Sequence, residues 1–256
     1  MDLDPGKRGI GSNVISLETV DSTNAFAVEL GERQAAHGTV VVAEKQTKGR
    51  GRLGRTWASP SGGNIYMSVL LRPSVRLEDV TILTVMAGVA CVRALRDATG
   101  VPVAIKWPND LMVDGKKLGG ILTEIKSASG RVSFAAVGIG INVNADFGNF
   151  PPDIRDLATS LKIETGVRYP KNSLITGILK EMGHWYDILL KTGKRPLIEA
   201  WRSFSPMLGR QVRVVMINSE TLTGIAQDIT DEGMLLVRLP SGAVKTISAG
   251  DLTVLR

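Results

Sequence analysis

The stretch EKQTKGRGRLGRTWASPSGGNIYMSVLLRPSVRL, residues 44–77, joins a basic, glycine-rich loop to an apolar strand. No acidic residue stands between Glu44 and Glu78. Basic residues and glycines are interleaved in its first dozen positions: Lys45, Lys48, Arg50, Arg52 and Arg55, with Gly49, Gly51 and Gly54. Glycines let main-chain N–H groups approach a ligand closely, and arginine supplies forked donors that match phosphate or carboxylate oxygens. The pattern predicts an anion-binding loop rather than a solvated basic face.

Length and composition limit the class of protein. The chain has 256 residues, which suits one large domain or a large and a small one, with a substantial core. Hydrophobic residues make up 43% and charged residues 22%, which is ordinary for a globular protein. The formal net charge of +6 favours anionic partners. A local anion site at the basic loop explains this charge at least as well as a nucleic-acid surface does.

Cysteine content and the N-terminus bear on the compartment. The single cysteine, Cys91, cannot form an internal disulfide and falls on the apolar stripe of an expected helix. We therefore expect a small core residue and a reducing, cytoplasmic environment. The N-terminal MDLDPGKRG lacks the apolar core of a signal peptide, and no run reaches the ~18 apolar residues of a membrane span. No membrane partner is expected.

Residues up to about 207 mix helical and strand patterns. Strands are expected over 14–20, 39–43, 64–71, 103–107, 118–127 and 131–144. Helices are expected over 77–99, 173–191 and 196–204, and after the cap Asp21-Ser22-Thr23-Asn24, where Gly31 interrupts the helix. Asp114-Gly115 is a strong type I′ hairpin signal, and residues 145–171 are expected to be irregular.

The composition changes after Pro206. Five short strand candidates follow within about fifty residues, and turn sequences such as Asp-Glu-Gly and Pro-Ser-Gly divide them. Closely spaced short strands of this kind indicate a small β-barrel.

Three further motifs carry groups that can do chemistry. KWPND, residues 106–110, ends a strand with a lysine, a tryptophan, an amide and a carboxylate, although a turn around a buried tryptophan explains it equally well. Lys117 stands beside Gly119-Gly120, and an exposed turn lysine is the alternative. Gly138-Ile139-Gly140 leads to Asn142, and hairpin glycines are the alternative there. The sequence contains no Walker A spacing, no His or Cys metal cluster and no Ser-His-Asp pattern.

Taken in order, these motifs resemble those of the biotin–protein ligases. They are DSTN (21–24), EKQTKGRGRLGRTW (44–57), GGNIYMSVLLRP (62–73), KWPNDLMVDGKKLGGILTE (106–124) and VGIGINVN (137–144). The resemblance spans roughly residues 14–144, and the last fifty residues resemble the SH3-like domain of the family. Only about a dozen residues precede the first expected strand, so the chain resembles the short form without an N-terminal DNA-binding domain, and no DNA partner is expected.

The resemblance implies an α+β fold. It predicts a flexible tail over 1–12, a catalytic domain over 13–207 and an SH3-like β-barrel over 208–256. The catalytic domain is expected to have a mixed β-sheet with helices packed on it, as in class II synthetases and lipoyl-transferring enzymes. The implied activity is that of a biotin–[acetyl-CoA-carboxylase] ligase, acting as a monomer or a homodimer. Members of the family make biotinyl-5′-AMP from biotin and ATP-Mg²⁺, then pass biotin to one lysine of a biotin carboxyl carrier protein domain.

The resemblance also assigns roles to residues by matched motif. It implies catalytic roles for Lys117 and Arg52. The implied biotin site comprises Ser22, Thr23, Asn24, Gln46, Arg50, Gly51, Arg52, Lys117, Gly120 and Gly138. The implied nucleotide site comprises Arg50, Arg52, Trp57, Lys106, Asn109 and Asn142. The metal ligands of the family have no matched position in this sequence.

Electrostatics agrees with these roles. The carboxylate of biotin and the α-phosphate of ATP repel each other, and fixed positive charge such as that of Arg52 and Lys117 offsets the repulsion. The neutral ureido ring of biotin needs hydroxyl and amide partners. A lipoate or octanoate ligase or transferase of the same fold is the main alternative, and it would need a narrow apolar channel. A non-catalytic RNA-binding protein is the second alternative, but aromatic residues are not interleaved with the basic ones.

We predict that the basic loop, residues 45–56, is mobile without ligand and becomes ordered over the adenylate. Ordering costs roughly 1–2 kcal/mol per residue, and a bound anion offsets this cost by neutralising the crowded cations. Trypsin should cut the free protein first within this loop, and saturating biotin plus ATP-Mg²⁺ should slow the cut sharply. A free protein that resists cleavage here, or a rate that ligands leave unchanged, would mean that the loop is rigid.

Overall fold

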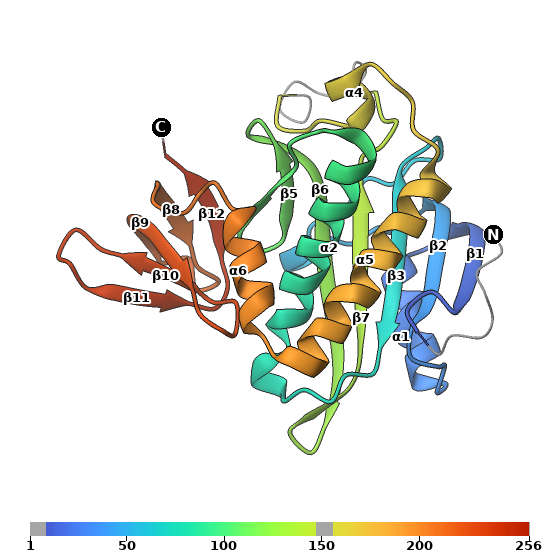
Figure 1. The fold of residues 1–256 in the computed structure, drawn as a ribbon, viewed down its shortest axis with the longest axis horizontal. Helices are drawn as coiled ribbons and strands as arrows, with labels where there is room; N and C mark the ends of the chain where they lie inside the picture. The colour runs from blue at the N-terminus through green and yellow to red at the C-terminus, as the bar shows by residue number, and fades with distance from the viewer. Residues whose placement is uncertain (1–8, 147–155, 256) are drawn as a thin grey trace.

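The computed structural model describes residues 9–146 and 156–255, and it places them in two sheets with accompanying helices (Figure 1). The larger sheet has the order β1-β2-β3-β7-β6-β5-β4. Its strands are β1 (Asn13–Val20), β2 (Thr39–Gln46), β3 (Ile65–Leu71), β4 (Ala104–Lys106), β5 (Asp110–Val113), β6 (Lys116–Ala128) and β7 (Arg131–Ile141). β1 and β2 are parallel and the other neighbours are antiparallel, so the sheet is mixed, as predicted.

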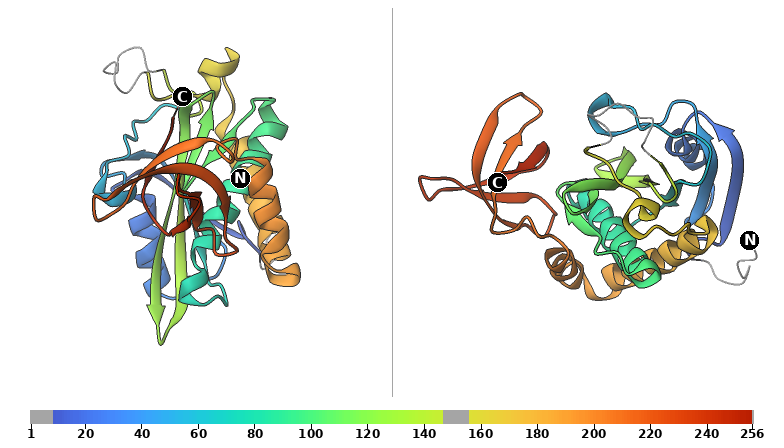
Figure 2. Two further views of the ribbon diagram at one scale, coloured as in Figure 1. Left: turned by 90° about the vertical axis from the view of Figure 1, so that its left-hand side faces the viewer. Right: turned by 90° about the horizontal axis from the view of Figure 1, so that it is seen from above.

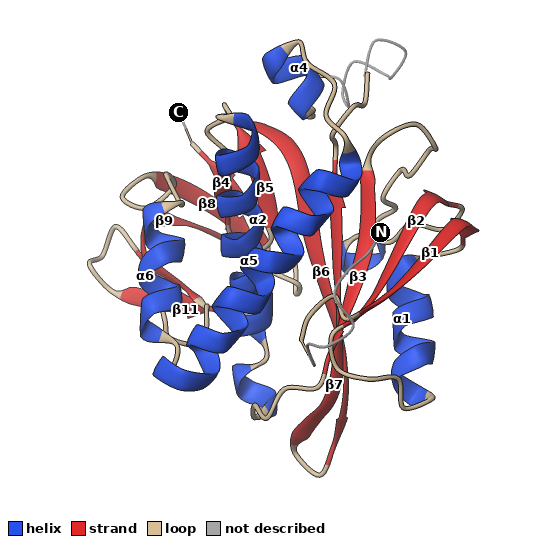
Figure 3. Cartoon of the chain, turned by 45° about the vertical axis from the view of Figure 1, so that its right-hand side comes forward, coloured by secondary structure: helices blue, strands red, loops and turns tan. Residues whose placement is uncertain are grey.

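Helices cover both faces of this sheet. They are α1 (Thr23–Glu32), α2 (Thr81–Thr99), α4 (Leu161–Thr165), α5 (Lys171–Thr192) and α6 (Arg195–Ser203), with short 3₁₀ turns at η1 (Arg52–Gly54) and η2 (Leu77–Asp79). α2 and α5 pack together over one face, and α1 packs on β2, β3 and β7 from the other (Figures 2 and 3). All seven residues of β3 are buried, which follows from cover on both faces.

Three local predictions from the sequence are confirmed: a hairpin turn, a helix cap and a buried cysteine. Asp114 and Gly115 both have positive φ, 46° and 79°, as a type I′ hairpin between β5 and β6 requires. Ser22 is the N-cap of α1, and its side chain accepts from the Ala25 N–H. Cys91 is fully buried on α2, as expected for a core residue.

Tertiary packing overrides the sequence patterns at three places. α1 runs through Gly31 instead of breaking there, because the ring of Phe134 lies 2.5 Å from the position that a Cβ would take. The segment expected to be irregular contains α4, whose N-cap Ser160 accepts from the Ile163 N–H. Residues 147–155 of that segment lie outside the described residues. Residues 9–12 of the expected tail form a turn bonded to Gly38.

The smaller sheet confirms the five strands expected after Pro206. They are β8 (Gln211–Val215), β9 (Thr221–Ile229), β10 (Leu235–Arg238), β11 (Val244–Ile247) and β12 (Asp251–Val254), in the order β11-β10-β9-β8-β12. β11 and β12 are the two edges and are not paired with each other, so the expected barrel is an open sheet. Closure requires hydrogen bonds between the first and last strands of a sheet. β12 bonds only to β8 among the described strands, and its other side faces the larger domain.

The two sheets share one apolar core. One buried cluster contains residues of α2 and α5, Trp201 and Met207, and Val212 and Val214 of β8. A hydrogen bond also joins the two parts: Trp107 Nε1 donates to the Gly233 carbonyl at 3.1 Å. In the described part of the chain, no helix is long and apolar enough to cross a membrane.

The shared core predicts a large effect of Trp201→Ala. Trp201 on α6 is 1% exposed, so its truncation leaves a cavity at the junction and should lower the free energy of unfolding by about 3–5 kcal/mol in urea titrations. Leu190→Ala on α5 is the control, because Leu190 is 55% exposed and should change the value by less than ~0.5 kcal/mol. Equal effects of the two changes would contradict the shared core.

Candidate active site

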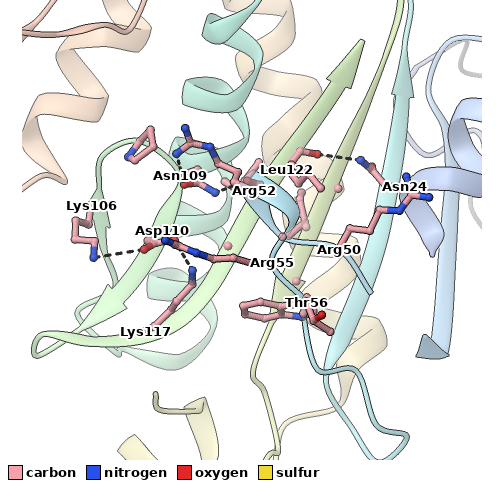
Figure 4. A pocket seen from close by; sticks show the side chains of 18 of the residues that line it. Asn24, Arg50, Arg52, Arg55, Thr56, Lys106, Asn109, Asp110, Lys117 and Leu122 are labelled. Carbon is pink, nitrogen blue, oxygen red and sulfur yellow. Dashed lines mark hydrogen bonds and ion pairs between the residues drawn. The ribbon is translucent and has the colours of Figure 1, made fainter. Parts of the chain in front are cut away.

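A cleft of about 440 Å³ opens where the α1 N-terminus, the basic loop and strands β5–β7 meet the end of β12 (Figure 4). It gathers nearly all the residues that the sequence predicted: Ser22, Thr23, Asn24, Gln46, Arg50, Gly51, Arg52, Trp57, Lys106, Asn109, Lys117, Gly120 and Gly138. Asn142 instead lines an adjoining cavity, together with Trp57, Lys106 and Lys117. Its amide donates to the Thr159 carbonyl at 3.0 Å. Segments separated by more than two hundred residues therefore converge on one cleft.

The floor of the cleft is bare backbone. Gly120 of β6 pairs directly with Gly140 of β7, and Gly138 lies two residues before Gly140 on the same face. A Cβ at Gly138 would lie 2.7 Å from Asn24 Oδ1, and one at Gly140 would lie 2.6 Å from Trp57 Nε1. The glycines therefore let the side chains of Asn24 and Trp57 reach the floor. The spacing G-x-G in a strand, which puts both glycines on one face, was the sequence signal for this floor.

The α1 end of the cleft carries neutral hydrogen-bonding groups. Gln46 Oε1 accepts from the Thr23 N–H at 2.8 Å and from the Thr23 hydroxyl at 3.1 Å. Gln46 Nε2 donates to the Ser59 hydroxyl at 2.8 Å, and the Ser68 hydroxyl donates to Thr23 Oγ1 at 2.9 Å. This network fixes the hydroxyl and amide groups before a ligand enters.

Asn24 has an unused acceptor at the same end. Its amide nitrogen donates to the Leu122 carbonyl at 3.3 Å and to Glu124 Oε2 at 2.5 Å. Its Oδ1 is buried and has no partner among the described residues. An unsatisfied buried oxygen is costly, so this atom is suited to accept a hydrogen bond from a ligand. Arg50 lies near, with its guanidinium 3.5 Å from Glu124 Oε1.

The end of the cleft opposite α1 carries positively charged side chains, two of which pair with the same carboxylate. Asp110 Oδ1 lies 2.6 Å from Lys117 Nζ, and Asp110 Oδ2 lies 3.5 Å from Lys106 Nζ. Arg52 donates to Asn109 Oδ1 at 3.2 Å, and Asn109 Nδ2 donates to the Ile121 carbonyl at 2.6 Å (Figure 4). Several positive charges therefore face one small volume, where a low dielectric strengthens their action on an anion.

Burial is the main influence on Arg52. It lowers the pKa of the guanidinium, the charges of Asp251 and Asp110 raise it, and Arg55 lowers it further. Arginine stays protonated throughout the physiological range, so the consequence is a fixed and partly desolvated charge. Such a charge suits an anion better than a fully hydrated lysine would.

The basic loop is attached to the smaller domain. Arg55 forms an ion pair and two hydrogen bonds with Asp251 at the start of β12. Arg52 Nη1 lies 3.5 Å from the Gly250 carbonyl. Within the loop, the Gly51 N–H donates to the Arg55 carbonyl at 2.7 Å, and Leu53 adopts a positive φ of 54°. β12 therefore supports the loop from outside the larger domain.

Several residues of the site are not among those that the sequence predicted. Asp110 stands inside the KWPND motif, so the motif itself was a signal for it. Glu124 pairs with Asn24 and Arg50 but carries no local signal. Asp251, Leu252 and Thr253 line the cleft from β12, and only the tertiary arrangement brings them there. No group of three metal-ligating side chains occurs within residues 9–146 and 156–255.

Comparison with known proteins gives the family. Residues 16–142 match the Biotin/lipoate A/B protein ligase family, and residues 207–252 match the Biotin protein ligase C terminal domain. The bifunctional ligase/repressor BirA of Bacillus spizizenii is 39% identical over 94% of this chain and 74% of its own length. The biotin–[acetyl-CoA-carboxylase] ligase of Mycobacterium tuberculosis is 34% identical over 97% of this chain and 92% of its own.

A solved structure supports the same grouping. The biotin protein ligase from Aquifex aeolicus, in complex with biotin and ATP, superimposes with a TM-score of 0.80 at 33% identity, covering 95% of this chain and 99% of that one. The chain belongs to the biotin protein ligase family.

We predict that Gly140→Ala displaces the Trp57 indole, because the new Cβ would lie 2.6 Å from Nε1. The chain has four tryptophans, so the Trp57 indole signal can be followed in a ¹H–¹⁵N spectrum and assigned with Trp57→Phe. The control is Gly177→Ala on α5, whose Cβ would lie an ordinary 3.7 Å from Ala94. An unchanged Trp57 signal in Gly140→Ala would show that the close approach does not hold in solution.

Proposed function

We propose that this chain activates biotin with ATP-Mg²⁺ to biotinyl-5′-AMP, and that it transfers biotin to one lysine of a biotin carboxyl carrier protein domain. The observation that carries the proposal is the polarity of the cleft, which joins a neutral hydrogen-bonding end to a cationic end over a glycine floor. Biotin has the same polarity, with a neutral ureido ring at one end and a carboxylate at the other.

The first step joins two anions. A carboxylate oxygen of biotin attacks the α-phosphorus of ATP, the bond from that phosphorus to the bridging oxygen breaks, and pyrophosphate leaves. Lys117 and Arg52 are the catalytic residues, because their charges offset the repulsion between the carboxylate and the phosphate. Asp110 holds the Lys117 ammonium at 2.6 Å, so this charge is positioned before the substrates meet.

The neutral end selects the ring. Ser22, Thr23, Asn24 and Gln46 offer hydroxyl and amide partners, and the free Oδ1 of Asn24 accepts from a ureido N–H. Gly120 and Gly138 allow the ligand to approach the backbone. The other proposed biotin-binding residues come from the basic loop and the cationic end: Arg50, Gly51, Arg52 and Lys117.

The nucleotide lies along the cationic end and into the adjoining cavity. Its proposed contacts are Arg50, Arg52, Trp57, Lys106, Asn109 and Asn142. The Trp57 ring, with Lys117 Nζ 5.6 Å from its centroid, provides a flat apolar surface for the base. Mg²⁺ arrives on the phosphates and needs only one or two protein carboxylates, and the cleft has Asp110 and Asp251.

The second step transfers the acyl group. The carrier lysine, as a free amine, attacks the acyl carbon of the anhydride, the bond to the AMP oxygen breaks, and an amide forms. β12 and the attached loop form the rim of the cleft, so the smaller domain is placed to present the carrier. The single buried cysteine fits a cytoplasmic setting for this reaction, with the chain acting as a monomer or a homodimer.

One assay tests the proposal against a lipoate or octanoate ligase of the same fold. Exchange of radiolabelled pyrophosphate into ATP requires a substrate that is adenylated reversibly. Biotin should support this exchange and lipoate should not. The ligase names of relatives such as the Mycobacterium tuberculosis enzyme favour biotin. If lipoate supports the exchange and biotin does not, the substrate is lipoate and the proposal is wrong.

Lys117→Ala should lower biotin-dependent exchange by ~10²-fold or more, as loss of one charge-stabilising donor does. The fold should survive, because the Lys117 side chain is partly exposed at the cleft. Lys116→Ala is the matched control, since Lys116 is an exposed neighbour outside the cleft and its variant should keep exchange. Near-normal exchange in a folded Lys117→Ala protein would remove Lys117 from the mechanism.

A further inference from the structure

A second hollow lies away from the cleft, between residues 9–12, the end of β3 and the exposed side of α5. It has a volume of about 720 Å³, and we call it the α5 groove. None of the residues that line it lines the catalytic cleft. It contains both histidines of the chain, His37 and His184. The proposed ligase reaction makes no use of this groove.

A glycine in the middle of α5 opens onto this groove. Glycine destabilises a helix interior relative to alanine, so a mid-helix glycine usually has a packing reason. In the same helix, a Cβ at Gly177 would make an ordinary van der Waals contact with Ala94 at 3.7 Å. A Cβ at Gly183 would meet nothing within 4 Å. No described part of the chain therefore explains Gly183, and its bare backbone leaves room for a molecule from outside.

The lining of the groove has two basic side chains, Arg72 and Lys180, and one carboxylate, Asp187. Arg72 donates to the carbonyls of Ala35 and Gly31 at 3.0 and 2.8 Å, but it forms no ion pair within the described residues. Lys180 also has no ion-pair partner in that part of the chain. Asp187 is the one carboxylate in the lining, and it pairs with Lys191 at 3.0 Å. The field inside the groove therefore favours an anion.

His37 adds a directed donor. Its Nδ1 accepts from the Arg72 N–H at 3.0 Å, so that nitrogen carries no proton and the neutral ring has its proton on Nε2. Burial, with the nearby charge of Arg72, lowers the pKa of His37, so the ring is neutral at physiological pH. The ring packs against that of Tyr186 with the centroids 5.0 Å apart and the planes tilted by 36°.

The remaining wall is apolar. Ile10, Leu179, Tyr186 and Leu190 line the groove beside the charged groups, and Leu190 is 55% exposed. We propose that the α5 groove binds a small organic anion, with its phosphate or carboxylate on Lys180 and the His37–Arg72 corner and its apolar body over Gly183. Inorganic phosphate lacks the apolar body and should bind more weakly.

The two histidines allow a direct test. With ¹³C label at the imidazole Cε1 positions, the intact protein gives two signals, and both report the groove. Phenyl phosphate, added up to about 10 mM, should shift both signals in a saturable way, because a millimolar Kd is within reach of one charged contact plus an apolar one. Benzyl alcohol, which has the ring without the charge, should leave them in place.

Variants locate the site. Lys180→Gln should weaken phenyl phosphate binding about fivefold, as loss of one charged partner does. Lys171→Gln, the control on the same helix outside the lining, should bind as the unchanged protein does. Gly183→Leu fills the space with a good helix former and should abolish the shifts without lowering the melting temperature.

Three results would overturn the proposal. They are the absence of any shift with phenyl phosphate, equal shifts with benzyl alcohol or inorganic phosphate, and unchanged binding in Gly183→Leu. Each is informative because the variants should remain folded: Lys180 is exposed, and a Cβ at Gly183 would meet nothing within 4 Å.

Discussion

The pairing of β6 with β7 at Gly120, Gly138 and Gly140 is the constraint on which the site depends. Gly120 faces Gly140 across the ladder, and Leu122 faces Gly138. A methyl group at Gly138 or Gly140 would exclude Asn24 or Trp57 from the floor. Antiparallel strands in register thus create a strip of bare backbone that is flat and already hydrogen-bonded. Such a strip does not need to reorganise when a ligand lies on it.

The charges above this strip are balanced in the free protein. Asp110 is shared by Lys106 and Lys117, and Asp251 is held by Arg55. Without these carboxylates, four crowded cations would repel one another and weaken the folded state. A phosphate that enters the cleft can neutralise the same cations that Asp110 and Asp251 neutralise in the free protein. The site is therefore stable when empty and still attractive to anions.

The sequence predicted those features that short-range chemistry determines. The hairpin at Asp114-Gly115 needs positive φ at both residues, and the cap at Ser22 needs a hydroxyl one turn before a free N–H, so both could be predicted locally. The residues of the sequence motifs also meet in one cleft, where the start of α1, the loop after β2 and strands β5–β7 lie together.

Features that depend on distant partners were not accessible from the sequence. Gly31 looked like a helix break, but Phe134, more than a hundred residues away, requires a glycine there. Asp251 carries no local signal in the sequence, and its ion pair with Arg55 at the cleft depends on the tertiary arrangement. The open smaller sheet has the same origin, because the side of β12 away from β8 faces the cleft instead of pairing with β11.

The continuous core between the two sheets has a consequence for how the protein folds. The match to the C-terminal domain family begins at residue 207, yet one buried cluster contains residues from both sides of this position. β9 of the smaller sheet packs on α6, and Trp107 of the larger sheet's side donates to the carbonyl of Gly233 in the β9–β10 turn. Unfolding of the smaller sheet alone would expose the part of this cluster that belongs to the larger domain, and exposure of buried apolar surface is costly. We therefore expect the two units to unfold in one transition.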